Sequence, residues 1–386
     1  MDVLKIREQI PVCQNMTYVN TGWSGPSPFS VVKAIKDRLD LEMNQGPTTS
    51  EVYQAGRDIQ ANIKTAMADL INASVDELCV TRNTTEGLNI VMNGLTWEEG
   101  DEIITCDLEH SSVLIPSYYQ QHRHGAVVKV LQFNPNENRE SILEKISDAI
   151  TDRTKMVFLS HVEYSTGLRM PVKEIRQLTK SREIFMLLDG AQSAGHIALD
   201  MKDLDCDFYS IPGQKWLLGP EGVGALYIRQ DLISQVQPTF VAGRSSLSPG
   251  NPYGFEPNVE SMDKFLLTST SVALQAGALE AIRFVNDPGV AAIEERDLDL
   301  STILKQALVD VPGINLLSPM DRQDSTGLVS LTVDGMTPEE AVNRLWQEHH
   351  IVCRQVSFPP GLRISLHFFN TEEEVEQVVE ALKRLV

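Results

Sequence analysis

The segment "IFMLLDGAQSAGH", residues 184–196, is an apolar run that ends abruptly at Asp189 and continues into small residues. A short unbroken apolar run is typical of a strand that is buried on both faces of a parallel sheet. Downstream, "IPGQKWLLGPEGVG", residues 211–224, places Lys215 among glycines and apolar residues. A lysine is costly to bury as an ammonium group and normally lies on the surface. We therefore expect Asp189 and Lys215 to share one site, against the simpler interpretation of Lys215 as a solvated turn residue.

Short β-rich runs alternate with amphipathic stretches from about residue 78 to residue 230. The expected strands are 78–82, 101–107, 126–132, 155–160, 184–189, 207–211 and 224–229. This alternation predicts an α/β fold with a mainly parallel seven-stranded sheet covered by helices on both faces. Ligands of such sheets bind outside the carboxyl ends of the strands. Asp189, His110 and the loop at 83–87 are therefore expected at that edge.

The pattern changes after residue 270. A long helix over 271–285 precedes a β-α-β-β-α succession that ends in "TEEEVEQVVEALKRLV". This predicts a smaller C-terminal α+β domain. We expect a large domain over 16–260 and a small domain formed by 1–15 together with 261–386.

Composition narrows the choice of partners and compartment. The 386 residues carry 33 basic and 53 acidic side chains, a formal net charge of −20, which argues against nucleic acid or an anionic membrane surface as partner. No apolar run approaches the ~20 residues of a membrane span, and "MDVLKIREQIP" lacks the apolar stretch of a signal peptide. Five scattered cysteines without a CxxC, and eight histidines without ligand spacing, predict reduced thiols, a cytoplasmic location and no metal site.

A lysine and an aspartate at one pocket suit pyridoxal 5′-phosphate (PLP). Lys215 would hold the cofactor covalently, and Asp189 would keep its pyridine nitrogen protonated. For the phosphate, "TRNTTEGLNI", residues 81–90, predicts a strand, a polar turn and a helix that begins near Thr84. Helix N-termini bind phosphate through free N–H groups, although an ordinary N-cap with a capping glutamate explains the same residues. His110 is a candidate to stack on the cofactor ring, or else a helix cap or a core residue.

These motifs resemble the class V aminotransferase group of PLP fold-type I enzymes, which includes the cysteine desulfurases. The likeness rests on "LLDGAQSAGH" and "CDFYSIPGQKWLLGPEGVGALYIR", and it extends to "YVNTGWSGPSP", "NTTEG", "EHSSV", "SHVEYSTG" and "GLRISLHFFNTEEEV". The resemblance implies the PLP fold-type I architecture and a homodimer. It implies cofactor contacts from Thr84, Thr85, His110, Asp189, Gln192, Gln214 and Lys215.

The same resemblance assigns further roles. Lys215 and His110 would be the catalytic residues, and Gln192 would meet the 3′-oxygen of the cofactor. Arg363 would pair with the substrate carboxylate, with a surface arginine as the alternative. Ser269, in "KFLLTSTS", residues 264–271, would complete the phosphate site from the neighbouring subunit.

Three departures from the family pattern bear on function. The family's S-G-H-K is P-G-Q-K here, so that Gln214 can still donate to a phosphate whereas Pro212 cannot, and Tyr164 takes the place of an asparagine. Cysteine desulfurases carry a nucleophilic cysteine before the carboxylate arginine, but the interval Arg354–Arg363 contains none. Cys353 lies just outside it, in an apolar strand that favours a packed structural thiol over a reactive one.

Without that thiol, the resemblance points to a C–S β-lyase of the cystine lyase type. Such an enzyme would act on L-cystine or L-cysteine and give pyruvate, ammonia and cysteine persulfide or sulfide, supplying sulfur for iron–sulfur cluster assembly through an acceptor protein. A cysteine desulfurase or selenocysteine lyase, a class V aminotransferase, and a PLP-fold protein without turnover remain the alternatives.

Overall fold

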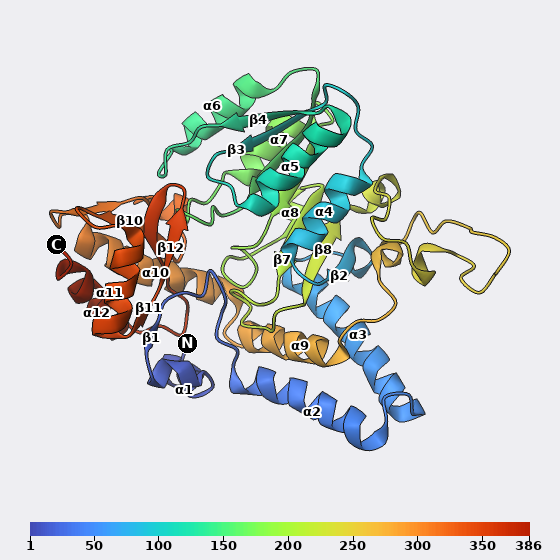
Figure 1. Ribbon diagram of the computed structural model, residues 1–386, viewed down its shortest axis with the longest axis horizontal. Coiled ribbons are helices and arrows are strands. Elements are labelled where there is room, and N and C mark those ends of the chain that lie inside the picture. The colour runs from blue at the N-terminus through green and yellow to red at the C-terminus, as the bar shows by residue number, and fades with distance from the viewer.

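The computed structural model describes residues 1–386, and its centre is a seven-stranded sheet (Figure 1). In spatial order the strands are β2 (Leu78–Thr81), β8 (Gly224–Ile228), β7 (Phe208–Pro212), β6 (Phe185–Asp189), β5 (Thr154–Ser160), β3 (Glu102–Cys106) and β4 (Val127–Leu131). All neighbours from β7 to β4 are parallel, and only β8 runs antiparallel to its two neighbours. The predicted α/β fold and its mainly parallel sheet are confirmed.

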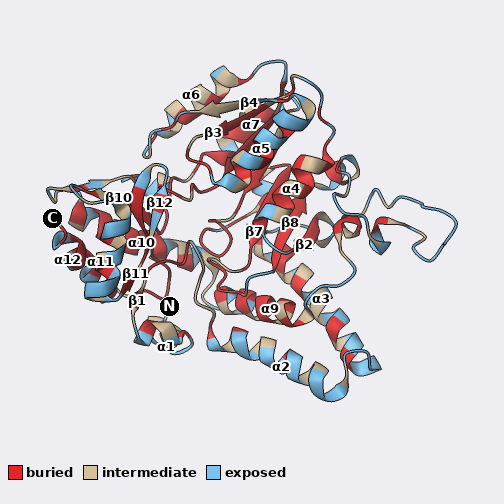
Figure 2. Ribbon diagram, in the orientation of Figure 1, coloured by how far each residue is buried: buried red, intermediate tan, exposed pale blue.

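Alternating residues of the inner strands supply two separate cores. Along β5, Met156 and Phe158 pack into one core, whereas Val157 and Leu159 pack into another. This follows from the two-residue period of a strand, whose side chains point to opposite faces. Both faces are covered by helices, which explains why these strands are apolar throughout, as the buried strands in Figure 2 show.

The chain also forms twelve α-helices. Their bounds are α1 (Val3–Glu8), α2 (Phe29–Gln45), α3 (Ser50–Leu70), α4 (Thr84–Gly94), α5 (Ser111–His124), α6 (Arg139–Ala149), α7 (Val172–Lys180), α8 (Met201–Leu204), α9 (Val272–Asn286), α10 (Val290–Leu308), α11 (Pro338–His349) and α12 (Glu372–Lys383). None of them is both long and apolar enough to cross a membrane. Helix α9 packs on α2 and α3, below the large sheet in Figure 1.

The C-terminal part forms a second body, at the left of Figure 1. Its antiparallel sheet has the order β12 (Arg354–Ser357), β13 (Pro360–Ser365), β10 (Leu328–Val333) and β9 (Ile314–Leu316), and its helices are α10 to α12. Strand β1 (Thr17–Tyr18) pairs with β11 (Ile351–Val352), and Arg7 forms an ion pair with Glu374 at 2.9 Å. The contact of Arg7 supports the expected grouping of residues 1–15 with the small domain, whereas β1, which also pairs with the small body, lies beyond residue 15. The domain boundaries stay a prediction.

The apolar strand expected around Cys353 is divided in two. Ile351 and Val352 pair with β1, while Arg354 opens β12, which turns back immediately into β13. Cys353 belongs to neither strand. The interval before Arg363 is therefore a tight hairpin.

Candidate functional site

A cavity of about 320 Å³ opens at the carboxyl edge of the large sheet, where β3, β5, β6 and β7 all end. Pockets of this size at this edge are usual ligand sites of parallel α/β sheets. Eight residues predicted from the sequence line the cavity. They are Thr84, Thr85, His110, Asp189, Gln192, Gln214, Lys215 and Arg363.

Ser269 is the exception among the predicted site residues. It lies in a separate cavity of about 710 Å³ that also includes Arg57, Gln60 and Thr268. Within one chain the structure does not bring Ser269 to the Lys215 pocket. Its expected role, across a subunit contact, stays a prediction.

The phosphate end of the pocket is formed by the start of α4. Asn83 caps this helix, since its side chain accepts a hydrogen bond from the backbone N–H of Glu86. The capping interpretation is thus correct, and it leaves the first N–H groups of the helix free, as at any helix N-terminus. The buried Oγ1 of Thr84 has no hydrogen-bond partner. A hydroxyl group that is free to donate, beside a helix N-terminus, fits a bound phosphate group.

Asp189 and Lys215 both line the pocket, and the charge of each shifts the pKa of the other. The carboxylate of Asp189 accepts a hydrogen bond from the backbone N–H of Ala191 at 2.7 Å. Burial raises the pKa of Asp189, while the positive charge of Lys215 opposes that rise. Burial also lowers the pKa of Lys215 to about 8, against the attraction of Asp189 and with the repulsion of Arg363 and Arg354. The pair fits a cofactor that needs both a nucleophilic amine and an acid partner.

His110 is a helix cap, one of the roles that its sequence context suggested, while its stacking on a cofactor ring stays a prediction. It caps α5, because its Nδ1 accepts a hydrogen bond from the backbone N–H of Ser112 at 3.1 Å. A ring nitrogen that accepts carries no proton, so the neutral ring bears its hydrogen on Nε2. Partial burial, followed by the charges of Lys215, Arg354 and Arg363, lowers the pKa of His110 to about 4. A neutral, pocket-lining ring results.

Gln192 is held in the pocket wall by its own amide. Its Nε2 donates to the carbonyl of Gly22 at 2.9 Å, and its Oε1 accepts from the indole of Trp216 at 2.8 Å. The expected contact with the 3′-oxygen of a cofactor stays a prediction.

Two guanidinium groups reach the same pocket. Arg363 is fully buried and donates from Nη1 to the carbonyl of Tyr164 at 2.7 Å, while its Nε and Nη2 have no partner. Burial, and then the charge of Arg354, lowers the pKa of Arg363 to about 9. A surface position for Arg363 is thereby excluded. An unpartnered, buried guanidinium requires an anion, and a carboxylate fits it in bidentate fashion.

Arg354 and Trp23 are site residues that the sequence reasoning missed. The guanidinium carbon of Arg354 lies 4.5 Å from the centre of the Trp23 ring, and its only hydrogen bond runs from Nε to the carbonyl of Gln355 at 3.1 Å. Trp23 lies in "YVNTGWSGPSP", which the sequence analysis used only as evidence for the family. The aromatic side chain of Trp23 among small residues could have indicated a pocket residue.

Cys353 does not line the pocket. It is buried in the apolar cluster of the small body, and burial raises the pKa of its thiol to about 12. A thiol that resists ionisation is a poor nucleophile. The interpretation of Cys353 as a packed structural residue therefore fits its surroundings.

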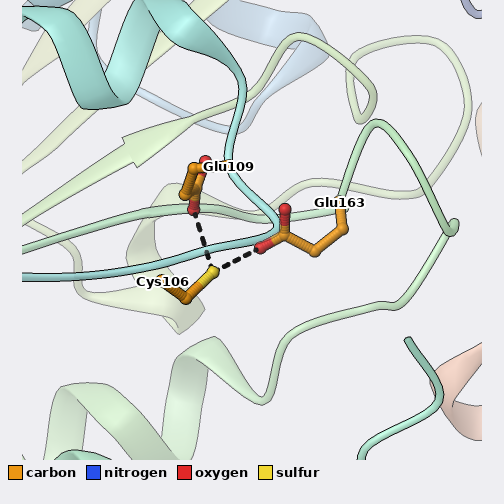
Figure 3. A group of neighbouring side chains, drawn as sticks. All are labelled: Cys106, Glu109 and Glu163. Carbon is orange, nitrogen blue, oxygen red and sulfur yellow. Dashed lines mark hydrogen bonds between the residues drawn. The ribbon is translucent and has the colours of Figure 1, made fainter. Parts of the chain in front are cut away.

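Glu109 and Glu163, which directly precede His110 and Tyr164 in the chain, form a buried group with Cys106 (Figure 3). The thiol of Cys106 contacts Oε1 of Glu163 at 3.5 Å and Oε1 of Glu109 at 3.9 Å. Ser160 donates to Glu109 from its backbone N–H at 2.5 Å and from its hydroxyl at 2.6 Å. Burial raises the pKa of Glu109 to about 8 and that of Glu163 well above its usual range. The geometry suits two carboxyl groups that hold a proton, and the expectation of no metal site stays a prediction.

The sequence pattern of the aminotransferase class-V family matches residues 23–378. The chain belongs to this family. A cysteine desulfurase of an Enterobacter species is 30% identical, with 99% of this chain and 98% of the relative covered. The isopenicillin N epimerase of Streptomyces clavuligerus is 28% identical, with 95% and 94% covered. The predicted family and the PLP fold-type I architecture are confirmed.

Among solved structures, two of a protein called C-DES are similar to this class-V chain. One shows the cystine C–S lyase C-DES with its reaction product cysteine persulfide, at 28% identity, a TM-score of 0.91 and coverage of 97% of this chain and 99% of that one. The other shows a C-DES mutant with glycine covalently linked to its PLP cofactor, at 29% identity, a TM-score of 0.90 and 98% of each chain covered.

Proposed function

We propose that this chain is a PLP-dependent C–S β-lyase that acts on L-cystine, and also on L-cysteine. The observation that carries the proposal is a pocket with two guanidinium groups, Arg354 and Arg363, and no cysteine in its wall. The family and the likeness to a cystine C–S lyase support it.

PLP is the cofactor of this enzyme. Thr84, Thr85 and Gln214 would hold its phosphate, Asp189 its ring nitrogen, and Lys215 its aldehyde carbon, with His110 against the ring. When bound, PLP draws electrons away from the substrate Cα and makes the proton there acidic.

The two arginines favour a substrate with two carboxylates. Arg363 is buried and needs an anionic partner, so it takes the carboxylate next to the reacting Cα. Arg354 stands nearer the mouth, against the exposed Trp23, and has no acidic partner. Cystine carries a second carboxylate beyond its disulfide, whereas cysteine does not. Arg354 would therefore add affinity for cystine alone.

The residues around the substrate account for the elimination. The amine of Lys215, whose pKa is about 8, is partly unprotonated near neutral pH and takes the proton from Cα. The Cβ–S bond then breaks, and its electron pair leaves with the sulfur. From cystine the leaving group is cysteine persulfide. The three-carbon remainder takes up one water and becomes pyruvate and ammonia.

The proposal also covers the sulfur acceptor, the cellular location and the oligomeric state. Sulfur leaves on the substrate and not on the enzyme, so persulfide would pass to an iron–sulfur acceptor protein in solution. All five cysteines are free thiols, which suits a cytoplasmic location. A homodimer would bring Ser269 of one copy toward the phosphate of the other.

Steady-state kinetics with cystine and with cysteine test the proposal. We expect stoichiometric pyruvate and ammonia from both, with the higher kcat/KM for cystine. Formation of alanine in place of pyruvate would identify a desulfurase. Activity that requires a keto acid would identify an aminotransferase.

A further inference from the structure

His367 is fully buried, and both of its ring nitrogens face oxygen atoms. Nδ1 lies 2.8 Å from Oδ2 of Asp297 on α10, and Nε2 lies 2.9 Å from the backbone carbonyl oxygen of Trp216. Asp297 is buried as well, and its Oδ1 has no hydrogen-bond partner. Trp216 directly follows Lys215 in the chain. A dyad from the C-terminal part thus contacts the backbone next to the pocket lysine.

The number of protons shared by Asp297 and His367 follows from the hydrogen bonds that these two side chains make. A carbonyl oxygen only accepts, so Nε2 of His367 must carry a proton for Trp216. The short contact between Nδ1 and Asp297 then needs one more proton, either on the carboxyl group or on the ring. An ionised Asp297 beside an unprotonated Nδ1 would place a buried charge against a lone pair.

The neighbouring His196 does not supply that proton. Its Nδ1 lies 2.8 Å from the carbonyl of Gln192 and must donate, and its Nε2 accepts from the backbone N–H of Gly327 at 2.8 Å. His196 is therefore neutral, and the nitrogen that it turns toward Asp297, at 3.9 Å, has no hydrogen to offer.

We propose that Asp297 and His367 form a neutral dyad, in which a protonated Asp297 donates to His367, and that this dyad positions Lys215 by holding Trp216. The positioning role rests on the proposed function of Lys215. Trp216 is fixed at three points, since its carbonyl meets His367, its indole donates to Gln192, and its ring stacks on His196 with the ring centres 3.5 Å apart. His367 and Asp297 are positioning residues that touch neither substrate nor cofactor.

The charged groups that flank the dyad have partners of their own. Glu294 and Arg296 flank Asp297 on α10, but Glu294 pairs with Arg169, and Arg296 binds the carbonyls of Phe368 and Asn370 together with Glu372. Burial raises the pKa of Asp297 well above its usual range and lowers the pKa of His367 to about 3. Both directions favour the neutral pair.

A neutral dyad gives stability a defined pH dependence. Between about pH 3.9 and pH 6.5, the unfolded chain holds one proton on the histidine and the folded chain holds one on Asp297, so this dyad adds no slope. Above about pH 6.5 the unfolded histidine is neutral while the folded dyad keeps its proton. Stability then falls with rising pH until the folded dyad loses that proton.

Asp297→Asn is the matched variant, because its amide N–H can donate to Nδ1 of His367 without a titratable proton. Asp297→Ala removes the donor. We expect Asp297→Asn to keep kcat within about threefold of the parent. Asp297→Ala should lower kcat by about tenfold or more and release PLP faster, because a small displacement of a reacting group lowers the rate strongly. In urea unfolding of the holoenzyme at one fixed PLP concentration, from pH 6.5 to 8.5, the parent should lose stability relative to Asp297→Asn by up to about tenfold in the unfolding constant per pH unit.

Nitrogen-15 spectra of the histidine rings test the dyad in the intact holoenzyme without any turnover. We expect His367 to remain a neutral ring, protonated on Nε2, from pH 5 to pH 8. The dyad is overturned if His367 is an imidazolium there, or if parent and Asp297→Asn show the same pH dependence of unfolding. The positioning role is overturned if Asp297→Ala folds and retains full kcat and PLP, or if Asp297→Asn loses as much as Asp297→Ala. Neither spectra nor unfolding depend on the lyase reaction, so a failure of the proposed function would be recognised separately.

Discussion

Arg363 donates its one hydrogen bond to the backbone carbonyl of Tyr164, at 2.7 Å, and keeps two buried nitrogens free. The side chain comes from β13 of the small body, and the carbonyl follows β5 of the large sheet. The substrate carboxylate that we propose for Arg363 would therefore be bound where the two parts of the chain meet.

Replacement of Arg363 tests this anchor. Arg363→Ala should lower kcat/KM by about 100-fold or more, mainly through KM, because a charged bidentate partner of the carboxylate is lost. Arg363→Lys keeps the positive charge but lacks the paired N–H donors of a guanidinium group, so it should recover only part of the lost kcat/KM. Steady-state kinetics with both substrates measure this, and an unchanged KM in Arg363→Ala would show that the carboxylate binds elsewhere.

Arg354 should separate the two substrates. Arg354→Ala is expected to raise KM for cystine by about tenfold while changing KM for cysteine by less than about threefold, because only cystine offers a second carboxylate. Arg354→Lys serves as the charge-preserving control. Equal losses for both substrates would place Arg354 at the reacting carboxylate or in folding instead.

Lys215→Ala should abolish both the visible absorbance of covalently held PLP and the elimination, because no other amine lines the pocket. Lys215→Arg retains a positive charge next to Asp189 and should be equally inactive. Absorbance spectra and pyruvate release check this. Substantial turnover by either variant would contradict the assignment.

Cys353→Ala should keep most of the activity. The thiol is packed in the apolar cluster of the small body, so we expect only a stability loss of about 1 kcal/mol from the truncation. Thermal unfolding and kinetics of the same preparation separate the two effects. Loss of activity by orders of magnitude in a folded Cys353→Ala protein would favour a desulfurase.

Glu163→Gln should flatten the pH dependence of stability. The folded Glu109–Glu163 pair retains a proton that the unfolded chain releases near pH 4.3, so the parent loses stability as pH rises from there toward the raised folded pKa values, by up to about 1.4 kcal/mol per pH unit. Glu163→Gln lacks this proton, so its stability should rise relative to that of the parent between pH 5 and pH 8. Parallel curves in urea unfolding would show that the pair is ionised throughout.

Sequence patterns were sufficient for the large sheet and for most of the pocket. The inner strands could be located because strands buried on both faces are mainly apolar runs, and Asp189 stood out where one of them stops. The start of α4 could also be located, because the residues of a helix cap lie next to one another in the sequence, as they do at Asn83.

Contacts between distant segments could not be read in this way. The stacking of Arg354 on Trp23 and the bond from His367 to Trp216 join residues that are more than 100 positions apart. The hydrogen bonds of the Gln192 side chain with Gly22 and Trp216 likewise depend on tertiary packing. Ser269 lies in a separate cavity of the same chain, and its expected role across a subunit contact stays a prediction.

The most direct test of the central claim follows the sulfur of labelled cystine through one turnover. Mass spectrometry of the protein and of the small-molecule products, after reaction with sulfur-labelled L-cystine, reports where the label goes. We expect one pyruvate and one ammonia per cystine, with the label in free cysteine persulfide and none on Cys353. Alanine as the product, with labelled sulfur bound to Cys353, would contradict the lyase assignment.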